Sequence, residues 1–301
     1  MNASAQTASD ATQAMGDRMP HGVKPLISVI TATRDAAATL PFTIASLRTQ
    51  TSSAFEWLVA DAASTDGTVE LLRKNQDLIS WWVSEPDAGI YDAWNKACRH
   101  ARGEWLLFLG AGDELAQPET LECCTPYLAE ARGEAVLVYG RLELLSEESR
   151  IPLEVFGRPW EEMRGKWEIG RPALPPHGAC FHHHSLFADP TPFDLRFPIA
   201  ADSNFLLRHV RDCPPIFLPL DITRSPLGGV SLRLDSARQI GGEIAAINHD
   251  LGIVPPLAHR VAEWLRRHVS GLINRLPQSL AHRCADLLRR IAGKRRRWSV
   301  K

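Results

Sequence analysis

The sequence predicts an α/β domain built on a mostly parallel sheet, because strand-like runs alternate with helical patterns along the first half of the chain. Apolar runs rich in β-branched and aromatic residues span 26–33, 55–60, 79–84 and 105–109. Polar residues follow each run where the strand is expected to end. Because the carboxyl ends of parallel strands share one edge of a sheet, we expect a ligand site at that edge.

Helical spacing of apolar residues follows each strand, as Leu40, Ile44 and Leu47 illustrate. Helices are expected at 40–50, 69–74, 90–101 and 118–131, and Ser64, Thr65 or Asp66 can cap the second of them with a side-chain oxygen. Further on we predict a strand at 135–145, a loop at 151–176, an extended segment at 177–187, a helix at 200–211 and a short strand at 215–220. A loop as long as 151–176 is uncommon unless it is functional or disordered.

Composition divides the chain into three parts. Residues 1–24 are polar and are expected to form a disordered lead-in, 25–248 to form the domain, and 249–301 to form a basic amphipathic helical segment. Residues 259–301 carry 12 Lys/Arg against Glu263 and Asp286, a net +10, which leaves about −11 on the remainder of a chain whose total is −1. No apolar run reaches the roughly 18 residues of a transmembrane helix.

The cysteines favour a reducing compartment. Six cysteines form no C-x-x-C pair and no secretory pattern precedes them, so we expect reduced thiols and a cytoplasmic protein.

The polar residues are densest in the stretch 85–114. Glu85, Asp87 and Gly89 form an acidic turn, a helix with Tyr91, Asp92, Asn95 and Lys96 follows, and an apolar strand ends in Gly-Ala-Gly-Asp113. Carboxylates at strand ends can accept hydrogen bonds from a base or a sugar, and beside a diphosphate they need a cation. The pattern fits a nucleotide-diphosphate ligand, while neither G-x-G-x-x-G nor G-x-x-x-x-G-K-[ST] is present.

Six segments, in order, are TATR, DAASTDGT, SEPDAGIYDAWNKA, RGEWLLFLGAGDEL, IAADSNFLLR and GGVS. Together they resemble the family 2 glycosyltransferases of the GT-A fold, especially bacterial enzymes that build surface polysaccharides, over residues 25–231. The resemblance implies a mostly parallel sheet with helices on both faces and a nucleotide-diphospho-sugar donor, commonly a UDP-sugar. It also implies transfer of one sugar, with inversion, to a hydroxyl of a glycan or lipid-linked acceptor.

The resemblance assigns a donor side. Thr33 and Arg34 match the loop that sandwiches the base, Asp61 matches the carboxylate that accepts from uracil, and Asp87 matches an acidic turn near the nucleoside. The full set of donor-side candidates is Thr33, Arg34, Asp61, Ser64, Asp66, Glu85, Asp87, Gly89, Tyr91, Asp92, Asn95 and Lys96.

Asp113 matches the D-x-D metal motif, which steadies the departing diphosphate through a divalent cation such as Mg²⁺ or Mn²⁺. Gly110 and Gly112 stand where carboxylates are common in the family. Either Asp113 holds the cation together with water and phosphate oxygens, or the enzyme depends less on a metal.

Asp202 matches the family's catalytic base, which takes the proton of the acceptor hydroxyl. The alternative is that Asp202 only caps the helix that follows it. On the acceptor side, His177 lies where relatives place a polar residue, and Trp160 and Trp167 can stack on a sugar or anchor the loop in the core. A zinc site around His177, His182, His183 and His184 lacks the usual spaced Cys/His pairs.

The basic C-terminal segment favours docking on an anionic membrane surface, where a lipid-linked acceptor would lie. A helical pair packed on the domain is the alternative, and nucleic acid is disfavoured because no recognition motif accompanies the charge. The second function that we consider is a catalytically weakened nucleotide-sugar-binding scaffold of a polysaccharide assembly. A glycoside hydrolase is less favoured, because it needs two facing carboxylates and no nucleotide site.

Overall fold

The computed structural model describes residues 24–229, 236–273, 275–291 and 297–298. The predicted lead-in, apart from Lys24, and the Val230 and Ser231 of the GGVS motif lie outside these residues. In the described part, a nine-stranded sheet has the order β3-β2-β1-β4-β10-β6-β11-β5, with β7 also paired to β6. Its strands are β1 (Ile27–Thr33), β2 (Phe55–Asp61), β3 (Trp81–Ser84), β4 (Trp105–Phe108), β5 (Glu114–Leu115), β6 (Leu137–Leu145), β7 (Pro152–Phe156), β10 (Cys180–His183) and β11 (Ile216–Pro226).

The sheet is mixed but mostly parallel in direction. β1 pairs in parallel with β2 and β4, β2 with β3, and β6 with β11. β10 is antiparallel to both β4 and β6, so β6 and β11 run in the same sense as β1 to β4. Six of the nine described strands therefore end at the same edge, as expected from the alternating pattern.

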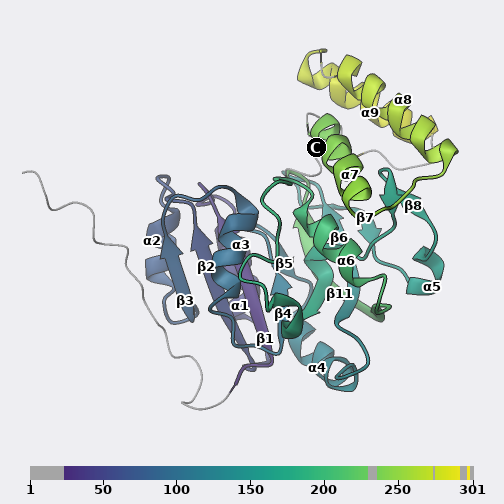
Figure 1. The fold of residues 1–301 in the computed structure, drawn as a ribbon. Coiled ribbons are helices and arrows are strands. Elements are labelled where there is room, and N and C mark those ends of the chain that lie inside the picture. Colours follow the sequence, from purple (N-terminus) through teal and green to yellow (C-terminus); the bar gives the residue numbers. More distant parts are fainter. Residues whose placement is uncertain (1–23, 230–235, 274, 292–296, 299–301) are drawn as a thin grey trace, which may run out of the picture.

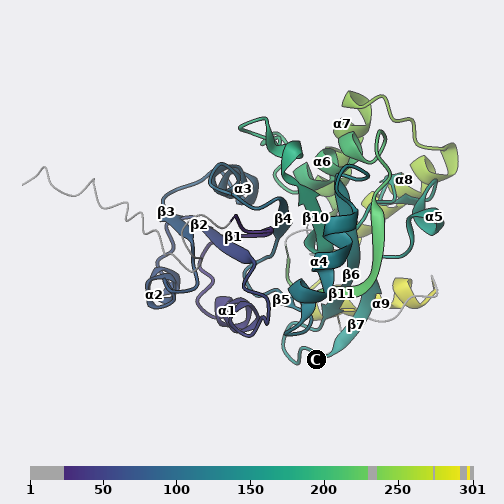
Figure 2. The same ribbon diagram turned by 90° about the horizontal axis from the view of Figure 1, so that it is seen from below.

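Helices cover both faces of this sheet (Figures 1 and 2). Side chains that alternate along the strands divide into two cores: Ile30, Leu58 and Phe108 pack with α3, α6 and α7, while Val29 and Trp57 pack with α1 and α4. The helices are α1 (Leu40–Arg48), α2 (Thr68–Lys74), α3 (Ile90–Cys98), α4 (Thr120–Glu130), α5 (Trp160–Met163), α6 (Ala201–His209), α7 (Ala237–Asp250), α8 (Leu257–Ile273) and α9 (Gln278–Ile291).

The predicted loop 151–176 is wrong, because this segment contains β7, α5 and a two-stranded sheet formed by β8 (Trp167–Glu168) and β9 (Arg171–Pro172). The turn between β8 and β9 consists of Ile169 and Gly170, with φ of +53° and +77°. Two residues of positive φ close a tight hairpin, but β-branched Ile is unusual there and gave no turn signal. The extended segment 177–187 is also shorter than expected, because 3₁₀ turns at His177–Ala179 and His184–Phe187 flank β10.

None of the helices in the described ranges has both the length and the apolarity that a membrane crossing requires.

A buried polar cluster joins β1, β2 and the start of β4. Glu56, which is 2% exposed, accepts hydrogen bonds from the Ser28 hydroxyl (2.6 Å), the Arg102 backbone N–H (2.6 Å) and Arg102 Nε (2.9 Å). Ser28 Oγ in turn accepts from the Gly103 N–H at 2.8 Å. The close approach of Gly103 to β1 is therefore part of what fixes the centre of the sheet.

A Cβ on Gly103 would lie 2.5 Å from the Ser28 backbone nitrogen. We therefore expect Gly103→Ala to displace β1 and to lower the free energy of unfolding by about 1–3 kcal/mol. Gly242→Ala, inside α7 with nothing within 4 Å of its Cβ, is the control and should raise it by about 0.5–1 kcal/mol. Urea unfolding compares the three proteins, and an unchanged midpoint for Gly103→Ala would contradict the described packing.

Candidate functional site

Asp61 lies at the end of β2, directly beside Thr33 of β1 in the strand register. Its carboxylate is 2% exposed and accepts four hydrogen bonds: from Thr33 Oγ1 (2.7 Å), Ser64 N–H (2.9 Å), Ser64 Oγ (2.6 Å) and Ser84 Oγ (2.6 Å). These donors occupy about as many positions as a carboxylate offers. A ligand N–H can bind Asp61 only by sharing or displacing one of the hydroxyls.

Asp66 ties the loop after β1 to the start of α2. It accepts from the Ala37 N–H (2.9 Å), the Thr68 N–H (3.1 Å) and the Thr68 hydroxyl (2.6 Å). These hydrogen bonds, that of Thr68 first, lower the pKa of Asp66. Ser64 makes a similar link, since its Oγ accepts from the Asp35 N–H at 2.8 Å. Both side chains shape the loops around an exposed Arg34.

The acidic turn after β3 is braced by Lys96. Its Nζ lies 2.9 Å from Glu85 Oε1 and 3.5 Å from Asp92 Oδ2. Asp87 Oδ1 accepts from the N–H of Gly89, whose φ of +120° suits glycine. The turn therefore holds its own shape at the sheet edge.

Asn95 faces the core. The side chain is 1% exposed and bonds both backbone groups of Phe193: Nδ2 donates to the carbonyl oxygen (2.9 Å) and Oδ1 accepts from the N–H (3.0 Å). Both polar groups of its side-chain amide bind Phe193. This differs from the prediction that Asn95 contacts the nucleotide-sugar donor.

Asp202 lies in the first turn of α6 and is linked to α3 by Tyr91. The Tyr91 hydroxyl lies 2.7 Å from the Ile199 carbonyl oxygen and 3.1 Å from Asp202 Oδ1, and the Ser203 N–H donates to the same Oδ1 at 2.6 Å. Burial raises the pKa of Asp202, and the Arg171 charge and these hydrogen bonds oppose the rise. The N-cap residue of α6 is Ala200 and no side chain caps the helix, so the simple capping role is not observed.

Arg171, which no sequence pattern singled out, is brought near Asp202 by the β8–β9 hairpin. Its guanidinium is largely buried, which lowers its pKa, and Nη1 donates to the Pro172 carbonyl oxygen at 2.9 Å. Its charge acts on Asp202 without a direct ion pair among the described residues. The Arg171 charge therefore favours the ionised form of the Asp202 carboxyl.

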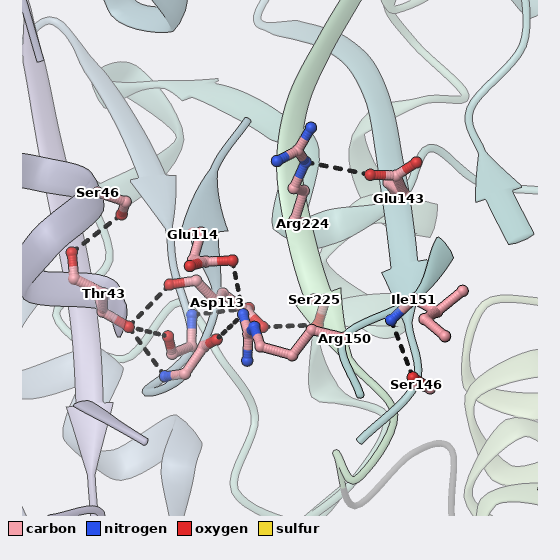
Figure 3. A network of polar contacts seen from close by, with 12 residues as sticks. Thr43, Ser46, Asp113, Glu114, Glu143, Ser146, Arg150, Ile151, Arg224 and Ser225 are labelled. Carbon is pink, nitrogen blue, oxygen red and sulfur yellow. Dashed lines mark hydrogen bonds and ion pairs between the residues drawn. The ribbon is translucent and has the colours of Figure 1, made fainter. Parts of the chain in front are cut away.

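Asp113 is held in the turn after β4 by contacts shown in Figure 3. Oδ2 accepts from the Gly110 N–H (3.0 Å), and Oδ1 accepts from the Ser225 hydroxyl (2.6 Å) near the end of β11. Thr43 of α1 supports the turn by accepting from the Gly112 N–H (2.9 Å) and donating to the Asp113 carbonyl oxygen (2.8 Å). Burial raises the pKa of Asp113, and Ser225 opposes the rise.

This geometry gives a physical reason for the two glycines. A Cβ on Gly110 would lie 2.8 Å from Asp113 Oδ2, and one on Gly112 would lie 3.0 Å from Thr39 Cβ at a φ of +109°. A carboxylate residue at 112 would need a rearranged turn, and one at 110 would displace the Asp113 carboxylate.

The residues around Asp113 fit a cation that is bound by one protein carboxylate and otherwise by phosphate oxygens and water. No group of three or more His, Cys, Asp or Glu suited to a metal occurs within the described ranges. Asp113 keeps acceptor capacity on both oxygens, and Mg²⁺ is often bound through one carboxylate plus phosphate oxygens and water. A second positive charge lies close by: Arg150 Nη2 is 2.6 Å from Glu114 Oε2, and its guanidinium lies 4.1 Å above the Phe42 ring.

The acceptor-side candidates are mostly packed. His177 stacks on Trp94 (5.1 Å between ring centroids, 17° between planes), its Nε2 is buried without a partner, and burial lowers its pKa to about 3. Trp160 packs against the core, and Trp167 stacks on His259 of α8 at 5.8 Å. The anchoring alternative therefore describes Trp160, whereas Trp167 packs on α8 and not in the core.

A family model described as "Glycosyl transferase family 2" matches residues 28–185. A "PGL/p-HBAD biosynthesis glycosyltransferase" of Mycobacterium bovis is 32% identical over 192 residues, which cover 61% of this chain and 69% of that protein. The "Putative teichuronic acid biosynthesis glycosyltransferase TuaG" of Bacillus subtilis is 33% identical over 94 residues, 30% of this chain and 37% of that one.

Two solved structures share the fold at low sequence identity. S. aureus TarS 1–349 in complex with UDP-GlcNAc has a TM-score of 0.57 and 19% identity, with 85% of this chain and 78% of that chain covered. The mannosyltransferase PcManGT from Pyrobaculum calidifontis, in complex with GDP-Man and Mn²⁺, has a TM-score of 0.56 and 19% identity, with coverages of 90% and 81%.

Because burial raises the pKa of Asp202, the folded state binds this proton more tightly than the unfolded chain, and stability is lost as the pH rises through the raised pKa. Asn keeps an oxygen for Tyr91 and Ser203 but buries no charge. We expect Asp202→Asn to melt at a higher temperature than the parent near pH 7.5, with a difference that shrinks toward pH 4. Each unit of pKa elevation corresponds to about 1.4 kcal/mol. Melting curves across this range test the sign, which a gain that grows on acidification would contradict.

Proposed function

Because this chain belongs to glycosyl transferase family 2, we propose that it is an inverting glycosyltransferase that uses a nucleotide-diphosphate sugar. The donor is a UDP-sugar, and the acceptor is a hydroxyl of a glycan or lipid-linked glycan in cell-surface polysaccharide synthesis. The predicted family and the GT-A fold are confirmed. The observation that carries the mechanism is the Asp202 carboxyl, largely buried, raised in pKa and linked by Tyr91 to the helix that follows the acidic turn.

Asp202 is the general base in this proposal. The Tyr91 hydroxyl and the Ser203 N–H both donate to its Oδ1, and in this mechanism Oδ2 accepts the proton of the acceptor hydroxyl. The hydroxyl oxygen then attacks the anomeric carbon from the side opposite the diphosphate, and the bond from that carbon to the diphosphate oxygen breaks. The configuration inverts, and the electron pair leaves with the diphosphate. Proton transfer of this kind contributes about 10²–10⁴ in rate.

The donor lies across the ends of β1, β2 and β4. Thr33, Arg34 and Asp61 receive the base, and exchange of one Asp61 hydroxyl partner for a ligand N–H makes that contact possible. Asp113 would hold a divalent cation, which offsets the charge of the departing diphosphate. Arg150 adds positive charge beside the same turn.

The names of two relatives support a surface acceptor: the Mycobacterium bovis relative is named for PGL/p-HBAD biosynthesis and TuaG for teichuronic acid biosynthesis. We place the protein on the cytoplasmic face of the membrane where such acceptors are assembled. The second candidate, a nucleotide-sugar-binding scaffold, is favoured by two observations: the four internal hydrogen bonds of Asp61 and the single carboxylate left in the metal motif.

The first test is turnover. With UDP-sugars, Mg²⁺ or Mn²⁺ and a panel of glycan acceptors, we expect Asp202→Asn to lower kcat about 10²–10⁴-fold while UDP binding is retained, because only proton transfer is lost. Asp212→Asn, exposed just beyond the other end of α6, is the matched control. Release of nucleotide diphosphate measures the rate, and calorimetry measures binding. Full turnover by Asp202→Asn excludes it as the base, whereas UDP binding without turnover by the parent identifies the scaffold.

The second test is metal removal. We expect EDTA to abolish transfer and Asp113→Asn to raise the Mg²⁺ concentration needed for half-maximal rate about tenfold or more, because one carboxylate ligand is lost. Restoration by Mn²⁺ or Mg²⁺ is the control. Transfer that EDTA leaves intact would assign neutralisation of the diphosphate to cationic side chains instead.

A further inference from the structure

α8 presents apolar side chains to solvent along one side. Leu257, Val261, Trp264, Leu265 and Val269 recur at helical spacing, and the exposed fractions of Leu257 and Trp264 are 72% and 58%. α9 adds exposed Leu280, Leu287 and Leu288. We call these eight residues the C-terminal apolar face. Exposed apolar side chains that share one side of a helix, as the five on α8 do, mark an interaction site.

The sequence of the C-terminal segment is strongly basic. Residues 259–301 hold 12 Lys/Arg and two acidic residues, while the total for the chain is −1. Arg260, Arg283 and Arg290 are exposed on α8 and α9 themselves. A partner must therefore combine negative charge with an apolar interior that accepts Trp and Leu side chains, which describes an anionic lipid surface.

The opposite side of α8 contacts the β8–β9 hairpin. His259 stacks on Trp167, and a Cβ on Gly170 would lie 3.4 Å from Glu263 Cγ. α7 contributes too, since Asn248 Nδ2 donates to the Gly170 carbonyl oxygen at 2.8 Å. This hairpin carries Arg171, whose charge acts on Asp202. The helix with the apolar face is thus in contact with the element that supports the candidate base.

The helices also lie at the appropriate end of the molecule. Figure 1 shows α7, α8 and α9 beyond the end of the sheet at which β6 and β11 finish. Those strands run in the same sense as β1 to β4, so this is also the end at which Thr33, Asp61 and Asp113 lie. A surface that binds the C-terminal apolar face would adjoin the acceptor side of the site.

We propose that the C-terminal apolar face docks on an anionic lipid surface, with Trp264 and Leu265 in the interface and the surrounding arginines on the headgroups. The benefit for a lipid-linked acceptor rests on the proposed function, but docking itself does not. A second copy of the chain fits less well, because self-association through this face brings two segments of net +10 together. Nucleic acid satisfies the charge but leaves the apolar side chains in water.

The test is flotation of the full chain, without nucleotide, on vesicles of phosphatidylcholine alone or with 30% phosphatidylglycerol. We expect the protein to bind only the vesicles that contain phosphatidylglycerol. The bound fraction should fall at least tenfold in 0.5 M NaCl and by a similar factor in the double variant Val261→Ser, Trp264→Ser. Leu195→Ser, an exposed apolar residue outside the helices, is the matched control and should bind like the parent. Because the replaced side chains are exposed, melting curves should be unchanged and show that the variants fold.

Three results would overturn the proposal: no binding to anionic vesicles, binding that the double variant retains, and dimerisation in light scattering that the double variant abolishes. The last would assign the face to a second copy. A failure here is distinct from a failure of the proposed function, because transfer to a water-soluble acceptor is measured without lipid.

Discussion

Withdrawal of carboxylates from water at one end of the sheet is the constraint that shapes this site. Burying a charge costs free energy unless hydrogen-bond donors surround it, and Asp61, Asp113 and Asp202 each accept hydrogen bonds from neighbouring residues. Asp61 accepts from hydroxyls at the ends of two strands and in one loop, Asp113 accepts from Ser225 on a strand more than 100 residues away, and Asp202 accepts from Tyr91 on another helix. The loops are therefore organised by the anions they enclose.

The burial of carboxylates also lowers the stability of the folded state at Asp113 and Asp202. Asp113 and Asp202 both have raised pKa values because burial outweighs their hydrogen bonds, so each opposes folding at neutral pH. Such groups are retained where chemistry needs them, which is the usual relation between activity and stability. Asp66 differs from these two residues, because its pKa is lowered and its hydrogen bonds to Ala37 and Thr68 stabilise a loop.

Sequence reasoning predicted the four β-α units and the shared edge, because periodicity reports which faces are buried. The roles proposed for Asp61, Asp113 and Asp202 came from a family resemblance. The hydrogen bonds of these residues could be described only from the structure. Arg171 was missed because a turn through Ile169 carries no turn signal, and Ser225 because β11 runs beyond the predicted end at 220. Asn95 was assigned to the donor because helical spacing gives a face but not what packs against it.

The place of β10 in the sheet sets an order of assembly. Among the described strands, β4 and β6 are joined only through this four-residue strand, whose last residue follows Phe108 by 75 residues. At 5–20 residues per second, a ribosome completes β10 roughly 4–15 s after β4 and roughly 2–8 s after β6, and until then each of these strands exposes an unpaired edge. The half that contains Thr33 and Asp61 can close before the half that contains Asp202 exists. The nascent chain is therefore most prone to aggregation after the half that contains Thr33 and Asp61 has been synthesised and before β10 is available.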